Sequence, residues 1–571
     1  MSKQAGRKGG QFYILAMAAL LLLQMGLLFS YGNKKAGFHE DELYTYYSSN
    51  KTAGLFVNDR QWLEREELYN DFVVLPGEGF RYDVVWQMQS WDVHPPLYYF
   101  VFHTVCSLFP GVFDKWLGIG INLAAYVGSY LLLAYCSYTA VLCGGLEKKI
   151  QDQEKEEGKK RRAQVISFLT CLLWGFSAAV ISGVMFIRMY QQLTLLILLC
   201  LGLHLRAVRR QDFRVRSFLL PLVATVFLGF LTQYYYIIFH FFLGAGFCLS
   251  LLRRKKVKEM FSYGAACAAG LLAALCYYPS ALSHIFRGYR GTEAVSEFGD
   301  ASNTLGRLRF FVGLFDDYVM CGTLSIWLLV LALLAVTVGY WKKRGKIGGG
   351  TANPAASLML FGAAGYFFTV SKTALLLGET SNRYQLPVYG ILSFLLLYGG
   401  WSLVESLMEV MAGKKTKETE NQETGGKRKG SVGLEKTLAC LFGAALVAID
   451  VIALAQGKVF FLYEEEKEIM EFVKEHNDVP AVVLYQETSG DHIWWLSDEL
   501  MEYPKVYLAS MGNKEPIADQ AVIRSDSLIV YAADSENSDA CLQGLLGTNW
   551  KTCQLVAQKG RGVWKLYYLT R

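Results

Sequence analysis

Long apolar runs separated by clusters of Lys and Arg constrain this chain more than any other feature. A helix needs about 20 predominantly apolar residues to cross the roughly 30 Å hydrocarbon core of a bilayer. Hydropathy identifies about eleven such runs, which begin near Gln11, Leu117, Gln164, Met189, Ser217, Tyr234, Phe261, Thr323, Ala355, Leu386 and Thr437. Because 53% of the residues are hydrophobic and only 19% are charged, we expect an α-helical polytopic membrane protein.

The basic clusters predict how these runs are oriented. Lys and Arg favour the cytoplasmic side of a membrane, and here they gather at 148–162, 206–216, 253–258, 342–346 and 414–436. If successive spans alternate in direction and the apolar stretch 95–109 does not cross the membrane, all these clusters face the cytoplasm. That stretch is short and is closed by Pro110-Gly111, which favours an interfacial or re-entrant helix.

This arrangement places the N-terminus in the cytoplasm. The segments expected on the outer side are 32–116, 281–321, 377–384 and everything after about residue 457. We therefore predict a multi-pass protein of the cytoplasmic membrane of the cell, with an extracytoplasmic C-terminal region.

The composition changes after residue 456 to that of a water-exposed domain. Short runs rich in β-branched and aromatic residues predict strands at 481–485, 505–508, 527–531 and 562–569, and helical stretches lie between them. We expect two domains, a membrane domain over 1–456 and a small extracytoplasmic α/β domain over 457–571.

The twelve cysteines contain no metal or redox motif. Most lie in the apolar runs, where they act as small apolar residues, and none has Cys-x-x-Cys spacing. Cys541 and Cys553 both fall in the C-terminal domain, and an oxidising compartment would allow them to pair. The sequence leaves that pairing open.

Three adjacent acids, Glu40, Asp41 and Glu42, follow the first apolar run. A lipid-borne substrate would present its polar end at this level of the membrane. Neighbouring carboxylates repel each other, which raises the pKa of at least one of them and suits general-base catalysis. A solvated helix start explains the same triplet, because acids are favourable in a first turn. Both interpretations stay open at this point.

A second polar segment, Asp92-Val93-His94-Pro95-Pro96, precedes the helix that is not expected to cross. Two prolines restrict the backbone and suit the first turn of a helix. A His just before a helix N-terminus is well placed to meet an anion, because unpaired N–H groups point there. Asp92 is close enough in sequence to orient His94. A simple helix-start signal is the alternative interpretation.

Three segments that combine Arg, Tyr or Gln come from distant parts of the chain. They are Arg188-Met189-Tyr190, Thr232-Gln233-Tyr234-Tyr235-Tyr236 and Ser381-Asn382-Arg383-Tyr384-Gln385-Leu386-Pro387. Each alone fits an interfacial anchor. Anchors would spread over both faces of the membrane, whereas these three segments and the two acidic ones all fall on the outer side. A shared outer pocket is therefore favoured.

Together these motifs resemble the GT-C superfamily of polyprenyl-phosphate-sugar-dependent glycosyltransferases, and within it the bacterial protein O-mannosyltransferase and aminoarabinose transferase group. The resemblance covers roughly residues 11–405. It is carried by Asp41-Glu42, Asp92-x-His94-Pro95-Pro96-Leu97-Tyr98-Tyr99, Arg188-x-Tyr190 and Arg383-Tyr384-x-x-Pro387. It implies a GT-C fold in which the first outer loop carries interfacial helices.

The resemblance also implies roles for individual residues. Asp41 matches the position of the catalytic base, and Glu42 would position the acceptor or share the proton. His94 matches a position near the donor phosphate. Gln233 stands where many relatives have a His, so this position departs from the family pattern. The remaining expected substrate contacts are Glu40, Asp92, Tyr98, Arg188, Tyr190, Arg383 and Tyr384.

The implied reaction moves a sugar from a polyprenyl-phosphate donor to an acceptor on the outer side, with inversion. The expected partners are this donor, membrane lipids and a protein, lipid or cell-wall glycan acceptor, but no nucleic acid. No cofactor is certain, and a divalent metal stays open because no ligand pair has a diagnostic spacing.

Two other classes of protein compete with the transferase. One is a transporter or flippase of lipid-linked substrates, which would be expected to carry ionisable residues near the middle of its spans. Here the charged positions lie at span ends on one side. The other is a non-catalytic membrane assembly factor that acts through its C-terminal domain.

Overall fold

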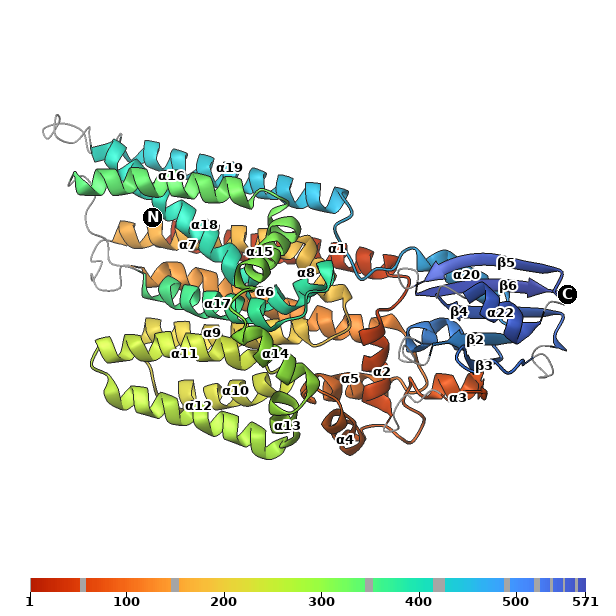
Figure 1. Ribbon diagram of the computed structural model, residues 1–571. Coiled ribbons are helices and arrows are strands. Elements are labelled where there is room, and N and C mark those ends of the chain that lie inside the picture. Colours follow the sequence, from red (N-terminus) through yellow and green to blue (C-terminus); the bar gives the residue numbers. More distant parts are fainter. Residues whose placement is uncertain are drawn as a thin grey trace, which may run out of the picture.

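The protein is described by a computed structural model over residues 2–51, 58–144, 153–344, 353–413, 427–486, 493–517, 524–534, 538–547, 550–559 and 563–571. Its helices form a long bundle, and a mixed sheet lies beyond one end of that bundle (Figure 1). Helix α2 (Glu40–Asn50) lies between the bundle and the sheet. The polar motifs of the sequence meet at this junction.

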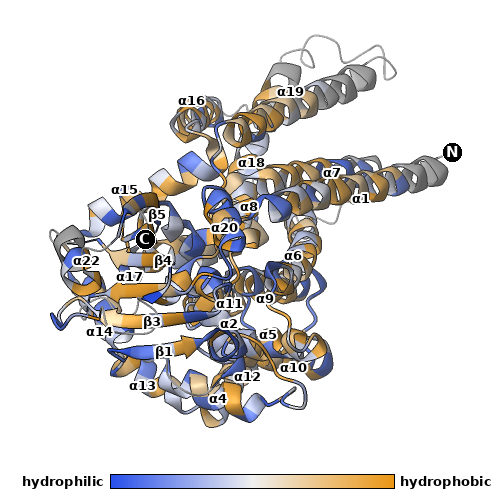
Figure 2. Ribbon diagram, turned by 90° about the vertical axis from the view of Figure 1, so that its right-hand side faces the viewer, coloured by the Kyte–Doolittle hydropathy of each residue, from blue (hydrophilic) through white to orange (hydrophobic). Residues whose placement is uncertain are grey.

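Nine helices in the described part of the chain are long and apolar enough to cross a membrane. They are α1 (Ser2–Lys34), α6 (Lys115–Cys143), α9 (Tyr190–Arg210), the π-helical turn η1 (Val215–Leu219) continued by α10 (Leu220–Thr232), α11 (Tyr236–Arg253), α12 (Val257–Tyr277), α16 (Leu324–Lys343), α17 (Pro354–Thr373), and the short η3 (Gly378–Ser381) continued by α18 (Asn382–Gly413). Hydrophobic residues run along α1 and α16 (Figure 2). The prediction of an α-helical multi-pass membrane protein is confirmed.

Two predicted spans differ in form from these nine. The span expected from Gln164 consists of α7 (Gln153–Phe176) and α8 (Ala178–Met185), whose axes differ by 57° because the backbone at Ser177 is extended. The span expected from Thr437 lies in α19 (Lys427–Ala455), and its described apolar part, Ala439–Ala455, is short. Hydropathy does not reveal the bend at Ser177, because apolar residues continue on both sides of it.

The segment between α1 and α6 forms α2, α3 (Arg65–Asn70), α4 (Tyr82–Trp91) and α5 (Leu97–Leu108). Helix α5 has 12 residues, too few to cross a bilayer, as the sequence indicated for the stretch 95–109. Pro96 is its N-cap residue, so the two prolines begin this helix. Because α5 packs against both α2 and α6, it holds the segment around His94 beside α2.

Further helices cover the same end of the bundle between α12 and α16. They are α13 (Ser280–Phe286), α14 (Tyr289–Gly299), α15 (Thr304–Phe315) and the π-helical turn η2 (Asp316–Met320). Helix α14 buries none of its residues, whereas α15 buries one face against α17 and α18. The bundle therefore carries a helical surface layer next to the start of α18.

In the described residues after α19, the chain forms three short α-helices and five strands. These are α20 (Glu466–Glu475), α21 (Ser497–Leu500), α22 (Ser538–Leu546), β2 (Ala481–Tyr485), β3 (Lys505–Ser510), β4 (Ser527–Ala533), β5 (Thr552–Lys559) and β6 (Trp564–Thr570). The strands predicted at 481–485, 505–508, 527–531 and 562–569 correspond to β2, β3, β4 and β6. Strand β5 was not predicted, because most of its residues are exposed and its sequence lacks a buried pattern.

The sheet has a sixth strand, which the segment between α1 and α6 supplies. Strand β1 (Gln61–Glu64) pairs antiparallel with β3, and Trp62 lies opposite Tyr507. The strand order is β1-β3-β2-β4-β6-β5, with β2 parallel to β3 and β4 and with β6 antiparallel to β4 and β5. The sheet thus reaches across the boundary expected between residues 456 and 457.

Some expectations fall on parts of the chain outside this description. The side chain of Cys541 is among them, and so its pairing with Cys553 stays a prediction. Parts of the basic clusters at 148–162, 342–346 and 414–436 also lie outside the described residues.

Candidate active site

The site begins at the first turn of α2, which contains Glu40, Asp41 and Glu42. His39 caps this helix: its Nδ1 accepts a hydrogen bond from the backbone N–H of Asp41 at 3.0 Å, and its own backbone N–H donates to Glu42 Oε2 at 2.6 Å. This is the reciprocal pattern of a capping box, with His in the place that Ser or Thr usually takes. The acids do start a helix, and this start determines where their side chains lie.

Asp41 lies between two arginine side chains from distant segments. Arg383 Nη1 donates to Asp41 Oδ2 at 2.7 Å, and Arg188 Nη2 lies 3.9 Å from Asp41 Oδ1. Arg188 Nη1 also donates to the backbone carbonyl of Asp41 at 3.1 Å. The side chains of Arg188 and Arg383 are 5% and 6% exposed, whereas that of Asp41 is 31% exposed. An accessible carboxylate is therefore held against two buried cations.

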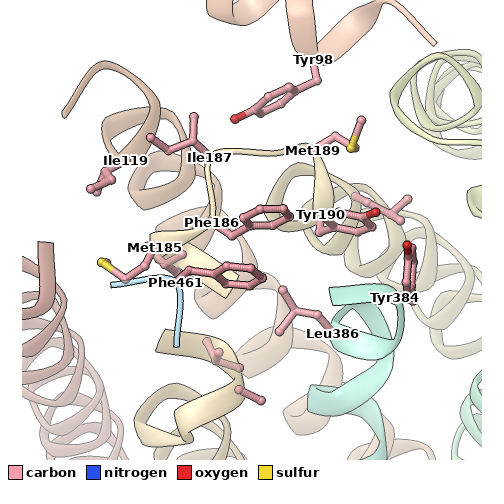
Figure 3. Close-up of a cluster of buried hydrophobic side chains, with 14 of the residues drawn as sticks. Tyr98, Ile119, Met185, Phe186, Ile187, Met189, Tyr190, Tyr384, Leu386 and Phe461 are labelled. Atoms are coloured by element: carbon pink, nitrogen blue, oxygen red, sulfur yellow. The ribbon is translucent and has the colours of Figure 1, made fainter. Parts of the chain in front are cut away.

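Aromatic rings surround the guanidinium group of Arg383, which lies at the start of α18. Its Cζ lies 5.1–6.0 Å from the ring centres of Tyr384, Phe186 and Tyr190. Phe186 stacks on Phe461 with ring centres 4.0 Å apart (Figure 3). Because the faces of aromatic rings attract cations, these rings fix the guanidinium group without neutralising its charge.

A hydrogen-bonded chain joins Asp92 to Arg188 through His94. Asp92 Oδ2 lies 2.8 Å from His94 Nδ1, and His94 Nε2 lies 3.2 Å from Arg188 Nη2. Since an arginine only donates hydrogen bonds, His94 Nε2 accepts here and its Nδ1–H donates to Asp92. Arg188 Nη1 further donates to Tyr99 Oη at 3.0 Å. The second polar segment of the sequence thus meets the first at Arg188.

The groups around Asp41 and Asp92 stabilise the ionised forms of these two carboxylates. Burial opposes the charged form of Asp41, but the charges of Arg188 and Arg383 outweigh burial and hold the pKa of Asp41 well below its usual range. Burial acts in the same way on Asp92, yet the adjacent His94 lowers the pKa of Asp92 to about 2. Burial lowers the pKa of His39 to about 4. At neutral pH the site therefore presents two carboxylates, two guanidinium groups and an uncharged His39.

Glu42 differs from Asp41 because protein groups enclose it completely. Lys35 Nζ donates to Glu42 Oε2 at 2.9 Å, and the backbone N–H of Ile187 donates to Oε1 at 2.7 Å. The side chains of Lys35 and Glu42 have no exposed surface, and burial raises the pKa of Glu42. Lys35 Nζ also donates to the carbonyl of Phe461 at 2.7 Å. Glu42 therefore joins the start of α2 to the α8–α9 connection and, through Lys35, to the chain after α19.

Three buried polar atoms in this region have no hydrogen-bond partner among the described residues. They are Nε of Arg188, Nε of Arg383 and Oη of Tyr98. Buried polar groups in proteins are nearly always paired. Two of these unpaired donors belong to cationic groups, so the cluster has unused capacity to donate hydrogen bonds to an anion.

The structure brings together most of the residues expected from the sequence, namely Asp41, Asp92, His94, Arg188, Tyr190, Arg383 and Tyr384. Tyr98 packs against Tyr99 with ring centres 6.0 Å apart. Figure 3 shows Tyr98 beside Ile187 in the connection that carries Arg188.

Glu40 and Gln233 have other surroundings. Glu40 accepts a hydrogen bond from Tyr44 Oη at 3.3 Å, one turn along α2. Gln233 accepts from the backbone N–H of Tyr235 in the turn between α10 and α11. Tyr235 is the residue of this turn whose ring lies near the cluster, 6.3 Å from that of Tyr384.

Sequence reasoning gave no role to three residues that complete the site: His39, Tyr99 and Lys35. His39 directly precedes the acids, in the position that caps a helix, and Tyr99 ends the motif that begins at Asp92. Both positions were therefore detectable. Lys35 follows an apolar run that ends in Lys34, and nothing in that pattern separates a buried lysine from an interfacial one.

The residues present do not fit a divalent metal. Within the described ranges, no group of three or more His, Cys, Asp or Glu side chains has an arrangement that holds a metal ion. Asp41 pairs with Arg188 and Arg383, and Asp92 pairs with His94. Cationic and N–H groups thus occupy the places around both carboxylates.

Comparison by sequence finds neither a matching family model nor a matching curated protein. Comparison by structure does find matches. The crystal structure of ArnT from Cupriavidus metallidurans bound to undecaprenyl phosphate superposes with a TM-score of 0.50 at 12% sequence identity, covering 98% of this chain and 97% of that chain. The two chains therefore share a fold over nearly their whole lengths, and this is the GT-C fold predicted from the motifs.

Two further matches are weaker in TM-score. ArnT from Cupriavidus metallidurans in the apo state has a TM-score of 0.49 at 13% identity, covering 98% of each chain. The arabinosyltransferase EmbB from Mycobacterium smegmatis has a TM-score of 0.36 at 11% identity, covering 73% of this chain and 40% of that chain.

Proposed function

We propose that this protein transfers a sugar from a polyprenyl-phosphate donor to an acceptor hydroxyl at the extracytoplasmic face of the cell membrane. The observation that carries the proposal is the accessible carboxylate of Asp41 between the buried side chains of Arg188 and Arg383. The shared fold with a protein bound to undecaprenyl phosphate supports the donor class.

The arginines bind the phosphate of the donor. Each has an unpaired Nε–H, and a guanidinium group presents several N–H donors in a geometry that matches phosphate. As the bond between the anomeric carbon and the phosphate oxygen breaks, its electron pair moves to the phosphate. Preorganised donors aimed at this developing charge lower the barrier, so the departing lipid phosphate requires no proton.

Asp41 acts as the general base. The acceptor oxygen attacks the anomeric carbon, and its proton passes to Asp41, so a single displacement inverts the configuration. In the structure Arg188 and Arg383 depress the proton affinity of Asp41. A bound phosphate shares those two charges, which raises the pKa of Asp41 toward its ordinary value. The base therefore becomes stronger when the donor is in place.

Glu42 supports this geometry without contacting the acceptor. Both of its oxygens accept hydrogen bonds from protein groups, and its side chain has no exposed surface. This role differs from the acceptor positioning that the family resemblance implied. Asp92 likewise acts indirectly, because it fixes the ring of His94 against Arg188.

The proposed orientation places the N-terminus in the cytoplasm and the sheet outside. The turns that carry the basic clusters 206–216 and 253–258 connect α9 to η1 and α11 to α12. They lie at the end of the bundle opposite α2 and the sheet (Figure 1). Lys and Arg favour the cytoplasmic side, so the site faces outward.

Membranes supplied with labelled polyprenyl-phosphate sugars test this function. Asp41→Asn removes the base but keeps the shape of the side chain, and we expect transfer to fall about 100-fold or more while labelled donor still binds. Asp83→Asn is the matched control, since Asp83 lies in the same loop and is paired with Arg81 at the surface. Equal transfer by Asp41→Asn and the unmodified protein would rule out the catalytic assignment, and no transfer from any such donor by the unmodified protein would rule out the function.

A further inference from the structure

Two turns at the end of the bundle remote from the site lie against each other. One connects α9 to η1 and contains Gln211 and Phe213, and the other connects α11 to α12 and contains Lys256. Lys256 Nζ donates to Gln211 Oε1 at 2.9 Å and lies 4.5 Å from the ring centre of Phe213. The two turns therefore form one surface.

A groove is open in this surface. Its volume is about 660 Å³, and it is lined by Arg210, Gln211, Asp212, Phe213, Arg214 and Glu259. Gln211 ends α9 in the left-handed conformation, with φ of 53°, which turns the chain sharply so that the residues after it line the groove. The groove is thus a product of the fold of both turns.

The surroundings of the groove are strongly basic. Within 206–216 and 253–259 the only acids are Asp212 and Glu259, against Arg206, Arg209, Arg210, Arg214, Arg216, Arg253, Arg254, Lys255, Lys256 and Lys258. Asp212 is already bonded by Arg214, at 2.8 Å to Oδ1 and 2.9 Å to Oδ2. Within the lining itself, Arg210 and Arg214 are matched by Asp212 and Glu259. The positive field therefore comes from the other eight arginines and lysines of the two turns, and it attracts anions to the surface around the groove.

Apolar side chains lie exposed at the edges of the same turns. Val215 is 63% exposed, Leu252 52%, Val257 42% and Phe261 70%. Helices α10 and α12, which rise from these turns, are candidate membrane spans. Such exposure is expected where side chains meet acyl chains, so the groove lies at the boundary between hydrocarbon and water.

We propose that this groove binds the headgroup of an anionic phospholipid, whose acyl chains extend along α10 and α12. A soluble anion would use only the basic groups, whereas a phospholipid also uses the exposed apolar edge. The cytoplasmic leaflet carries the anionic lipids of a cell membrane, and basic residues at its surface are attracted to them. The site is separate from Asp41 and its arginines, and the inference rests on the proposed membrane orientation but not on the proposed reaction.

The test measures lipids retained by the full-length protein extracted from vesicles that contain phosphatidylglycerol and phosphatidylcholine. Native mass spectrometry reports the retained lipids. Arg210→Gln combined with Arg214→Gln removes two positive charges from the groove, and we expect phosphatidylglycerol affinity to fall about 30-fold. Lys342→Gln combined with Lys343→Gln is the matched control, because it removes two charges from the last turn of α16 without touching the groove.

A lower amount of retained phosphatidylglycerol in the groove variant, with retention by the control variant unchanged, supports the proposal. An equal loss of phosphatidylglycerol from both variants would overturn it, because the lipid would then be attracted by the overall basic charge of the protein and not by the groove. Displacement of phosphatidylglycerol by inorganic phosphate would also overturn it, because the groove would then take soluble anions. Melting curves of both variants in detergent identify any loss that is due to unfolding, and Arg210→Lys, which keeps the charge, is expected to retain the lipid.

Discussion

Arg383 and Asp41 lie 342 residues apart in the chain and form an ion pair with an N–O distance of 2.7 Å. The pair joins the first turn of α18 to the first turn of α2. Only the Asp41 side of the pair is accessible. A ligand that enters the site thus meets the carboxylate first and the cation behind it.

Replacing Arg383 by Lys is expected to weaken donor binding although the charge is kept. Lys has neither the planar fork that binds phosphate at two points nor the flat group that stacks on Phe186 and Tyr384. Loss of one charged hydrogen bond is worth roughly 1.5–3 kcal/mol, so we expect the KM for the polyprenyl-phosphate donor to rise about 10- to 100-fold. Arg309→Lys, at an exposed position of α15, is the control and should leave KM unchanged.

We expect the Lys35–Glu42 ion pair to stabilise the fold only when both charged groups are present. Breaking a buried ion pair costs about 3–5 kcal/mol, because the remaining charge stays buried without a partner. Glu42→Gln and Lys35→Met should each lower the midpoint of thermal unfolding in detergent. The double variant should be more stable than the sum of the two losses predicts, and strictly additive losses would show that the two groups do not interact.

His39 is expected to make stability depend on pH. In the unfolded chain its pKa is near 6.5, whereas burial lowers it to about 4 in the folded protein. The unfolded state therefore takes up the proton first as the pH falls, and the contribution of His39, complete above pH 6.5, is lost progressively toward pH 4. His39→Asn keeps an acceptor that caps helices but does not titrate. Its unfolding midpoint should change less between pH 7 and pH 5 than that of the unmodified protein, and an equal change would exclude His39 as the responsible group.

The membrane orientation can be measured with two single-cysteine variants in a background without other cysteines. Glu66→Cys lies in α3 on the side of the sheet, and Lys258→Cys lies in the first turn of α12 at the opposite end of the bundle. Both positions are exposed. A membrane-impermeant maleimide should label Glu66→Cys in intact cells and Lys258→Cys only after permeabilisation. The reverse pattern would invert the proposed topology.

The sequence indicates the end of the helix bundle at which a residue lies more readily than it indicates the side chains that this residue contacts. Charge clusters and apolar runs locate the ends of the spans, because crossing a bilayer requires a minimum length and Lys and Arg prefer one side. This logic brings Arg188 and Arg383 to the same face as Asp41. It does not show that both side chains contact Asp41, since that depends on how α9 and α18 pack against α2.

The difference between Asp41 and Glu42 illustrates the same limit at the scale of one turn. Successive residues of a helix point about 100° apart, so one of two adjacent acids turns toward the protein when the other turns toward solvent. The sequence does not indicate which. The structure shows Glu42 enclosed by Lys35 and Ile187 and Asp41 partly exposed.

Strand β1 escapes sequence analysis for a different reason. It has four residues, Gln61–Glu64, and none of them is fully buried, so no alternating or apolar pattern is long enough to be noticed. Its conformation depends on β3, which lies far away in the sequence. The conformation of an edge strand often depends in this way on a neighbouring strand that the local sequence does not indicate.

The pairing of Gln61 with Leu508 has a consequence for biogenesis. A ribosome releases the chain from its N-terminus, so the loop that carries Asp41 leaves the tunnel long before the strand that receives β1. The ring of Phe461 against Phe186 and the carbonyl that binds Lys35 also arrive late. Chains that end before Phe461 therefore lack both the ring that stacks on Phe186 and the carbonyl that accepts from Lys35, and their pocket is incomplete.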